Sequence, residues 1–168
     1  MKLLTKTLFA AIILVAFALN VNAQSNSATA TATATIVAPI ELAVSANMNF
    51  GYVVGTAAGG TVVLDPDGTI TPTGVSLASG IATSPAIFDV TGEAGFNYSI
   101  TLPTVDPITL DDGSGNTMSV GTFTSTPVGT GTIDGSQISV GATLTVGASQ
   151  TPGTYTNNAD LTVTVNYN

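Results

Sequence analysis

Short segments in which apolar and polar residues alternate recur along most of this chain. The clearest of them are residues 61–64, 87–90, 96–102, 118–123, 142–146 and 161–167. Alternation with a period of two places the apolar side chains on one face of an extended strand, which does not suit an amphipathic helix. Turn-forming residues separate the segments, at 65–68, 92–95, 111–116 and 152–153. The pattern predicts an all-β, antiparallel β-sandwich.

The composition agrees with strands rather than helices. Beyond residue 24 the chain is rich in Thr, Val, Gly, Ala and Ser, and poor in the Glu, Lys, Arg and Gln that usually fill exposed helix faces. We therefore expect no amphipathic helix in this part of the chain. An open barrel or a β-solenoid is the alternative architecture, although no repeat of fixed length supports a solenoid.

The first 23 residues have the three parts of a secretory signal peptide. Lys2 and Lys6 precede an apolar run from residue 8 to residue 19, and the small-residue sequence 21–23 follows it. Cleavage is expected after Ala23. The run is too short to span a bilayer comfortably, so we predict no stable membrane anchor. The protein is expected to be secreted, through the periplasm, to the cell surface or the extracellular space.

The two basic residues of the chain both lie in that segment. The processed chain would keep ten carboxylates and no lysine, arginine or histidine, and cysteine and tryptophan are absent throughout. An activated nucleophile needs a neighbouring base, and nucleic-acid binding needs cations against phosphate. We expect a protein that is not an enzyme, needs no cofactor and binds no nucleic acid. Glycoside hydrolysis by a pair such as Glu41 and Glu93 is the enzymatic alternative.

Residues 28–36 alternate strictly between alanine and threonine and end at an isoleucine. In an extended strand, one face carries Ala28, Ala30, Ala32, Ala34 and Ile36. This stretch has no charge and no proline, so an exposed edge here would pair readily with another strand. We predict that it pairs either within its own domain or with a neighbouring chain. A low-complexity linker is the alternative.

The last segment has an equally regular face. Its apolar positions are Leu161, Val163, Val165 and Tyr167, with polar residues between them. So regular an inner face predicts a strand that is central to its sheet rather than a frayed end.

Two acidic turns are weak candidates for calcium binding. They contain Asp65 and Asp67 in one case and Asp111 and Asp112 in the other, each with nearby glycines. Carboxylates in such loops are typical calcium ligands, but neither turn has the full spacing of an EF-hand. Hairpin turns are the competing interpretation, and we expect no metal site.

Several of these segments together resemble a family of small secreted β domains, the domain of unknown function DUF4402. They are residues 28–39, 49–51, 65–68, 90–93, 98–102, 143–147 and 165–167. The ending, residues 152–156 with an alternating strand and the penultimate Tyr167, is also similar to subunits of archaic chaperone–usher pili and spore-coat U-type proteins. The resemblance implies an incomplete immunoglobulin-like, pilin-like β-sandwich that polymerises by donor-strand exchange.

The resemblance also implies an organisation of the chain. A signal peptide over 1–23 precedes an extension over 24–38 and a sandwich domain over 39–168. The alternating face Ala28 to Ile36 would be the donor strand, and the face Leu161 to Tyr167 would border the acceptor groove. The expected partners are further copies of the chain, with an assembly chaperone or an outer-membrane usher. The alternative is a monomeric, self-complemented binding module for a glycan or a protein.

Overall fold

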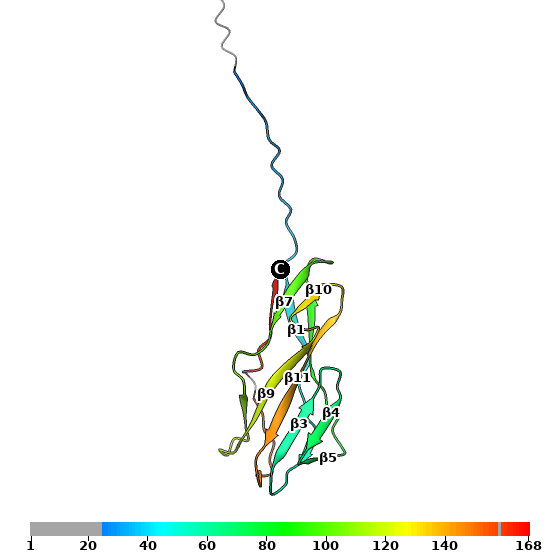
Figure 1. Cartoon of the computed structure of the whole chain (residues 1–168), viewed down its shortest axis with the longest axis vertical. Coiled ribbons are helices and arrows are strands. Elements are labelled where there is room, and N and C mark those ends of the chain that lie inside the picture. The colour runs from blue at the N-terminus through cyan, green and yellow to red at the C-terminus, as the bar shows by residue number, and fades with distance from the viewer. Residues whose placement is uncertain (1–24, 158) are drawn as a thin grey trace, which may run out of the picture. The chain divides into compact units, whose positions relative to one another are not determined.

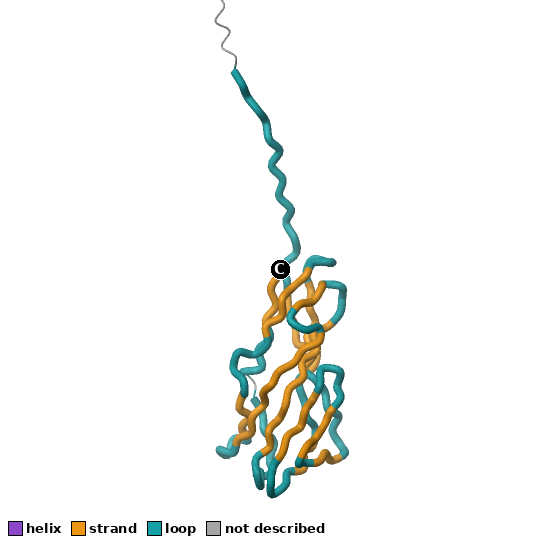
Figure 2. The backbone as a smooth tube through the Cα atoms, in the orientation of Figure 1, coloured by secondary structure: helices purple, strands orange, loops and turns teal. Residues whose placement is uncertain are grey.

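The computed structural model describes residues 25–157 and 159–168. Within these residues the chain forms antiparallel β strands and no helix (Figure 2). It divides into two units, Met1–Thr35 and Ile36–Asn168, and all the strands belong to the second. The predicted signal peptide, residues 1–23, lies outside the described residues. The prediction of an all-β, antiparallel fold is confirmed.

The strands vary from three to ten residues in length. In chain order they are β1 (Glu41–Ala46), β2 (Tyr52–Val54), β3 (Gly60–Leu64), β4 (Ile70–Thr73), β5 (Ser76–Ala78), β6 (Ala86–Thr91), β7 (Asn97–Thr101), β8 (Ile108–Asp111), β9 (Thr117–Thr126), β10 (Thr130–Thr132), β11 (Gln137–Val146) and β12 (Thr164–Tyr167).

The long strand β11 organises the largest sheet, whose order is β1-β6-β11-β3-β4 with β9 and β8 branching from β11. On one side β11 pairs first with β6 and then with β3. On its other side it pairs with β9, which Figure 1 shows running beside it. Because one strand serves two partial sheets in this way, the sheets of the second unit curl into a half-barrel.

Two smaller sheets complete the described strands. One has the order β10-β7-β12, and the other is the pair β2-β5. Among the described strands, β12 therefore lies at the edge of its sheet and pairs only with β7. The prediction that the last segment is a central strand is wrong, because a regular apolar face reports burial on that face and not a hydrogen-bonded neighbour on each side.

The core consists of two clusters, one against β7 and one against β8 and β9. The first is built on Ala86, Phe88, Val90, Tyr98, Ile100, Ile133, Ile138, Val140 and Val163. The second is built on Val62, Ile108, Val120, Ala142, Leu144 and Val146. Alternate residues of β11 contribute to both clusters and alternate residues of β6 to the first, as a period of two requires.

The predicted turn at 65–68 joins β3 to β4. The N–H of Gly68 donates to the carbonyl of Asp65 at 2.9 Å, and the N–H of Asp65 donates to the carbonyl of Thr69 at 2.8 Å. Gly68 has a φ of 86°, a conformation that glycine adopts without the strain that a side chain would bring. This turn and the one between β8 and β9 confirm that the acidic segments are hairpin connections.

Candidate functional site

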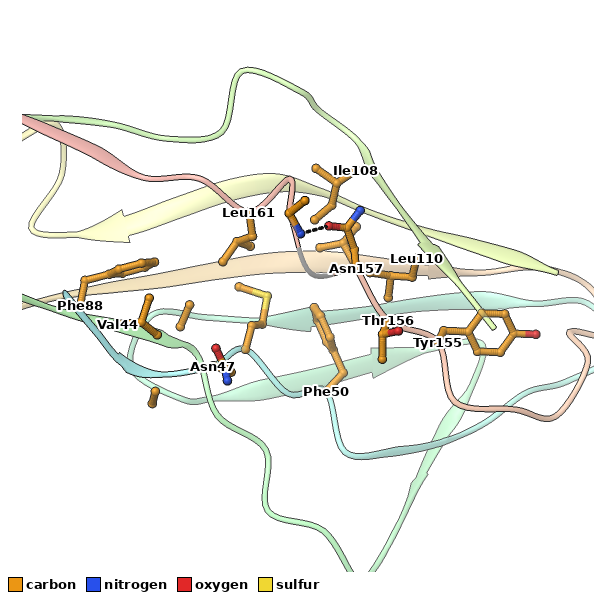
Figure 3. Close-up of a pocket in the computed structure, with 15 residues that line it drawn as sticks. Val44, Asn47, Phe50, Phe88, Ile108, Leu110, Tyr155, Thr156, Asn157 and Leu161 are labelled. Atoms are coloured by element: carbon orange, nitrogen blue, oxygen red, sulfur yellow. Dashed lines mark hydrogen bonds between the residues drawn. The ribbon is translucent and has the colours of Figure 1, made fainter. Parts of the chain in front are cut away.

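An apolar groove of about 430 Å³ lies between the start of the domain and its C-terminal segment. In Figure 3 the labelled side chains of Val44 and Phe50 lie on one side of this space, and those of Leu161 and Ile108 lie on the other. The full lining is Val44, Ala46, Asn47, Met48, Phe50, Ala86, Phe88, Ile108, Leu110, Val120, Tyr155, Thr156, Asn157, Ala159 and Leu161.

A second hollow, of about 780 Å³, continues the first. The two share Met48, Phe50, Tyr155 and Thr156 in their linings. Together they run from residue 44 to residue 55 along one border and from residue 150 to residue 161 along the other. We call this continuous depression the seam.

The first border of the seam consists of β1 and the residues after it. Strand β1 pairs with β6 on one side and with no other described strand. Beyond β1 the pairing continues on the side of β6, because the N–H and carbonyl of Asn49 exchange hydrogen bonds of 2.8 and 2.9 Å with Ser84. The opposite edge therefore has no ladder partner among the described residues. Val44 on this border is 62% exposed although it is apolar.

The second border is fixed by hydrogen bonds to β8. Thr156 and Asp111 exchange two backbone hydrogen bonds of 3.0 Å. The side chain of Asn157 donates to the carbonyl of Thr109 at 2.8 Å and accepts from the N–H groups of Ala159 and Asp160. These contacts turn the chain so that Leu161 lines the seam. Like β1, this border has strand neighbours on one side only among the residues described.

A set of hydrogen bonds closes the gap beyond the seam, where β1 begins and β12 ends. The hydroxyl of Tyr167 donates to the carbonyl of Ala38 at 2.8 Å and accepts from the N–H of Glu93 at 2.7 Å. The carboxylate of Glu93 accepts from the N–H of Ala38 at 3.2 Å. We call these three residues the clamp. Because a Cβ on Gly92 would collide with the Tyr167 hydroxyl, the glycine is needed for this close approach.

The predicted donor residues show no pairing in the structure. Residues 25–39 form no strand, and residues 25–36, which include Ala28, Ala30, Ala32, Ala34 and Ile36, are exposed. Ile36 is 97% exposed. The pairing of this segment stays a prediction.

The predicted acceptor residues divide between two places. Leu161 and Val163 precede β12, whereas Val165 and Tyr167 belong to it. Val163 is buried and the other three are half-buried, so all four turn toward the interior. Of these four, Leu161 lines the seam and Tyr167 forms the clamp.

Sequence reasoning missed the whole first border of the seam. Its apolar side chains, at positions 44, 46, 48 and 50, follow the same period of two as the recognised strands. That alternation was the available signal, and the polar and alanine positions within it made it weak. Ile108 and Leu110 on β8 were missed for the same reason.

Three of the four calcium candidates, Asp67, Asp111 and Asp112, accept hydrogen bonds within their own turns, and Asp65 contributes its backbone groups to the first turn. Asp67 accepts from the N–H of Thr69 at 2.8 Å, and Asp111 accepts from that of Gly113 at 2.6 Å. Asp112 accepts from the side chain of Asn116 at 2.7 Å, which is the main reason its pKa lies below the usual range. The hydrogen bond from Thr69 likewise lowers the pKa of Asp67. The described residues contain no group of three or more metal-ligating side chains.

These features define an all-β domain whose half-barrel is open along the seam. Residues 40–167 match the model of a domain of unknown function, DUF4402, and the chain belongs to this family. No curated protein and no solved structure matched the chain. Over the residues that the structure describes, no helix is long and apolar enough to cross a membrane. The family is the one that the sequence resembles.

Proposed function

We propose that this protein is a non-enzymatic extracellular structural subunit that assembles by β-strand addition. Its domain would be an immunoglobulin-like sandwich lacking one strand, and residues 25–37 of another copy would supply that strand. The observation that carries the proposal is the seam itself. It is a depression with an apolar first hollow, bordered by the edge of β1 on one side and by the irregular segment 150–161 on the other, and neither border has a ladder partner there among the described residues.

The seam has the properties of an unfilled strand position. An unpaired edge presents rows of N–H and carbonyl groups to any incoming strand, and natural proteins usually protect such edges. Apolar side chains around it, such as Val44 and Phe50, gain about 25 cal/mol for each Å² removed from water. One added strand would satisfy both borders and cover this surface.

The extension suits this position in length and charge. Residues 25–37 would span about 40 Å at roughly 3.3 Å per residue, and the border from 44 to 55 would span about 36 Å if fully extended. The extension carries no charged side chain, so no ion loses its hydration on entering an apolar seam. Alanine covers little apolar area, and the main-chain hydrogen bonds of β-augmentation would supply much of the affinity.

The location and the partners follow from the sequence. A signal peptide would export the chain, and the similarity to archaic pilins would make the product a surface filament or matrix. An assembly chaperone or an outer-membrane usher would cover the seam before assembly.

The test compares two valine-to-aspartate variants of the processed chain. Val44 borders the seam, whereas Val128 is 83% exposed and outside it. We expect the wild type and Val128→Asp to form ladders of oligomers in native mass spectrometry. Val44→Asp should remain monomeric, because a carboxylate in the seam loses hydration without gaining a cation.

A second part of the test measures strand addition directly. A chain lacking residues 25–37 should be a stable monomer that binds a labelled peptide of that sequence in fluorescence anisotropy. A full-length chain that stays strictly monomeric and unfolds when these residues are deleted would refute the proposal. It would support the self-complemented binding module instead.

A further inference from the structure

We infer that residues 37–40 and the clamp prevent this chain from filling its own seam, and that they thereby direct its extension to a second copy. The inference rests on the proposed function, since it concerns which copy supplies the strand. Tyr167 and Glu93 are its specificity-determining residues, because they hold the chain where a fold-back would have to begin.

Without such a barrier, the extension of the same chain would fill the seam in preference to the extension of another copy. A segment joined to its site by a short linker has an effective concentration on the order of millimolar. At micromolar protein concentration the cis arrangement would then be favoured by roughly a thousandfold over the trans arrangement. A chain that polymerises by strand addition therefore needs a structural reason not to complement itself.

The connection is too short for all but one cis arrangement. The alternating segment ends at Ile36 and β1 begins at Glu41, so only residues 37–40 join them. A strand that runs parallel to its sequence neighbour needs a crossover of about a dozen residues or more. The extension could enter its own seam only as an antiparallel hairpin with β1.

The residues at that point are unsuited to a hairpin turn. Two-residue hairpin loops need a positive φ at their first central residue or at both, which Gly, Asn and Asp provide. The sequence here is Val37, Ala38, Pro39 and Ile40. Pro39 has its φ fixed near about −65°, and it keeps the preceding Ala38 extended. Three-residue hairpin loops also use a left-handed residue, a conformation that β-branched Val37 and Ile40 disfavour. A four-residue loop built around a type I turn needs no such residue, and it is the loop that the clamp has to exclude.

The clamp adds a second barrier at the same residue. Ala38 donates its N–H to the Glu93 carboxylate at 3.2 Å, and its carbonyl accepts from Tyr167 at 2.8 Å. The peptide groups on both sides of Ala38 are therefore engaged with the domain. A reversal of the chain there would break these bonds, whereas a strand arriving from another copy would leave them intact.

The experiment supplies a turn and asks whether the polymer disappears. The first variant inserts Gly-Asn-Gly-Gly between Val37 and Ala38, which leaves Pro39 and the clamp residues in place. Its matched control inserts Thr-Ala-Thr-Ala at the same point, with equal length and no turn residue. A second variant, Ala38→Asn with Pro39→Gly, creates an Asn-Gly turn without changing the length of the chain. Native mass spectrometry measures the oligomer fraction, and thermal unfolding checks that each variant folds.

We expect the oligomer fraction of both turn-bearing variants to fall at least about tenfold. The high effective concentration of a strand in the same chain favours it over strands from other copies. Their monomers should also fail to bind the labelled 25–37 peptide, because their own extension already fills the seam. The control insertion should polymerise like the wild type. If both turn-bearing variants polymerise like the control, or if their monomers still bind the peptide, the inference is overturned. Failure of the chain lacking 25–37 to bind the peptide would instead refute the proposed function, and the inference with it.

Discussion

The gap between β1 and the C-terminal segment is closed at one end and open at the other. At the closed end, three hydrogen bonds join Tyr167, Glu93 and Ala38. At the open end, Val44 and Leu161 line a groove of about 430 Å³. The same two borders of one domain thus meet in two different ways.

The side chains account for this difference. Tyr167 is long enough to cross the gap, and its hydroxyl can both donate and accept. Phe96 supports its ring edge-on, with a centroid distance of 5.8 Å. The corresponding positions at the open end include the small residues Ala46 and Ala159, which neither fill the space nor offer a polar atom. Side chains of the domain therefore leave the open end uncovered, whereas Tyr167 bridges the closed end.

The largest expected effect comes from comparing the same substitution, valine to alanine, in the core and at the seam. Val62→Ala removes two methyl groups from a fully buried site and should lower the free energy of unfolding by about 2–3 kcal/mol. Val44→Ala, at a residue that is 62% exposed, should change it by less than about 0.5 kcal/mol. Urea denaturation of the chain lacking residues 25–37 measures both. Equal losses would show that the seam is already packed without an added strand.

A smaller effect is expected at the closed end. Tyr167→Phe keeps the ring and removes the hydroxyl that bonds to Ala38 and Glu93. At about 1 kcal/mol for each hydrogen bond, the free energy of unfolding should fall by about 2 kcal/mol. Tyr52→Phe is the matched control, since Tyr52 is 52% exposed and its hydroxyl has no hydrogen bond within the described part of the chain. An unchanged stability of Tyr167→Phe would mean that the clamp does not hold this end together.

Much of the fold follows from the alternation in the sequence. The segments at 61–64, 87–90 and 142–146 correspond to β3, β6 and the second half of β11. The shortest strands were not predicted. Strand β10 is Thr-Gly-Thr and has no apolar face of its own, so its conformation depends on hydrogen bonds to β7. Such a strand is set by its neighbour rather than by its own pattern.

The candidate site was less accessible to sequence reasoning. The alternation around Leu161 predicts which side chains turn inward, and the structure agrees. It does not predict which strands lie beside that segment, and the edge position of β12 was missed. The clamp joins Ala38 and Tyr167 across 129 positions of sequence, a separation at which no local pattern acts.

The smallest expected effect concerns the turns at Asp67, Asp112 and Asp134. These turns should affect stability at acid pH without affecting binding in the seam. Their pKa values lie below the usual 3.8 because of hydrogen bonds from Thr69, Asn116 and Ser136 respectively. A lowered pKa stabilises the folded state above the usual value, and this contribution is lost as the pH falls through the lowered one. The melting temperature should therefore drop below about pH 4, and a triple aspartate-to-asparagine variant should show a flatter pH profile. None of the three lines the seam, so peptide affinity should be the same in both proteins at pH 7. A weaker affinity in the triple variant would mean that these turns hold the borders of the seam apart.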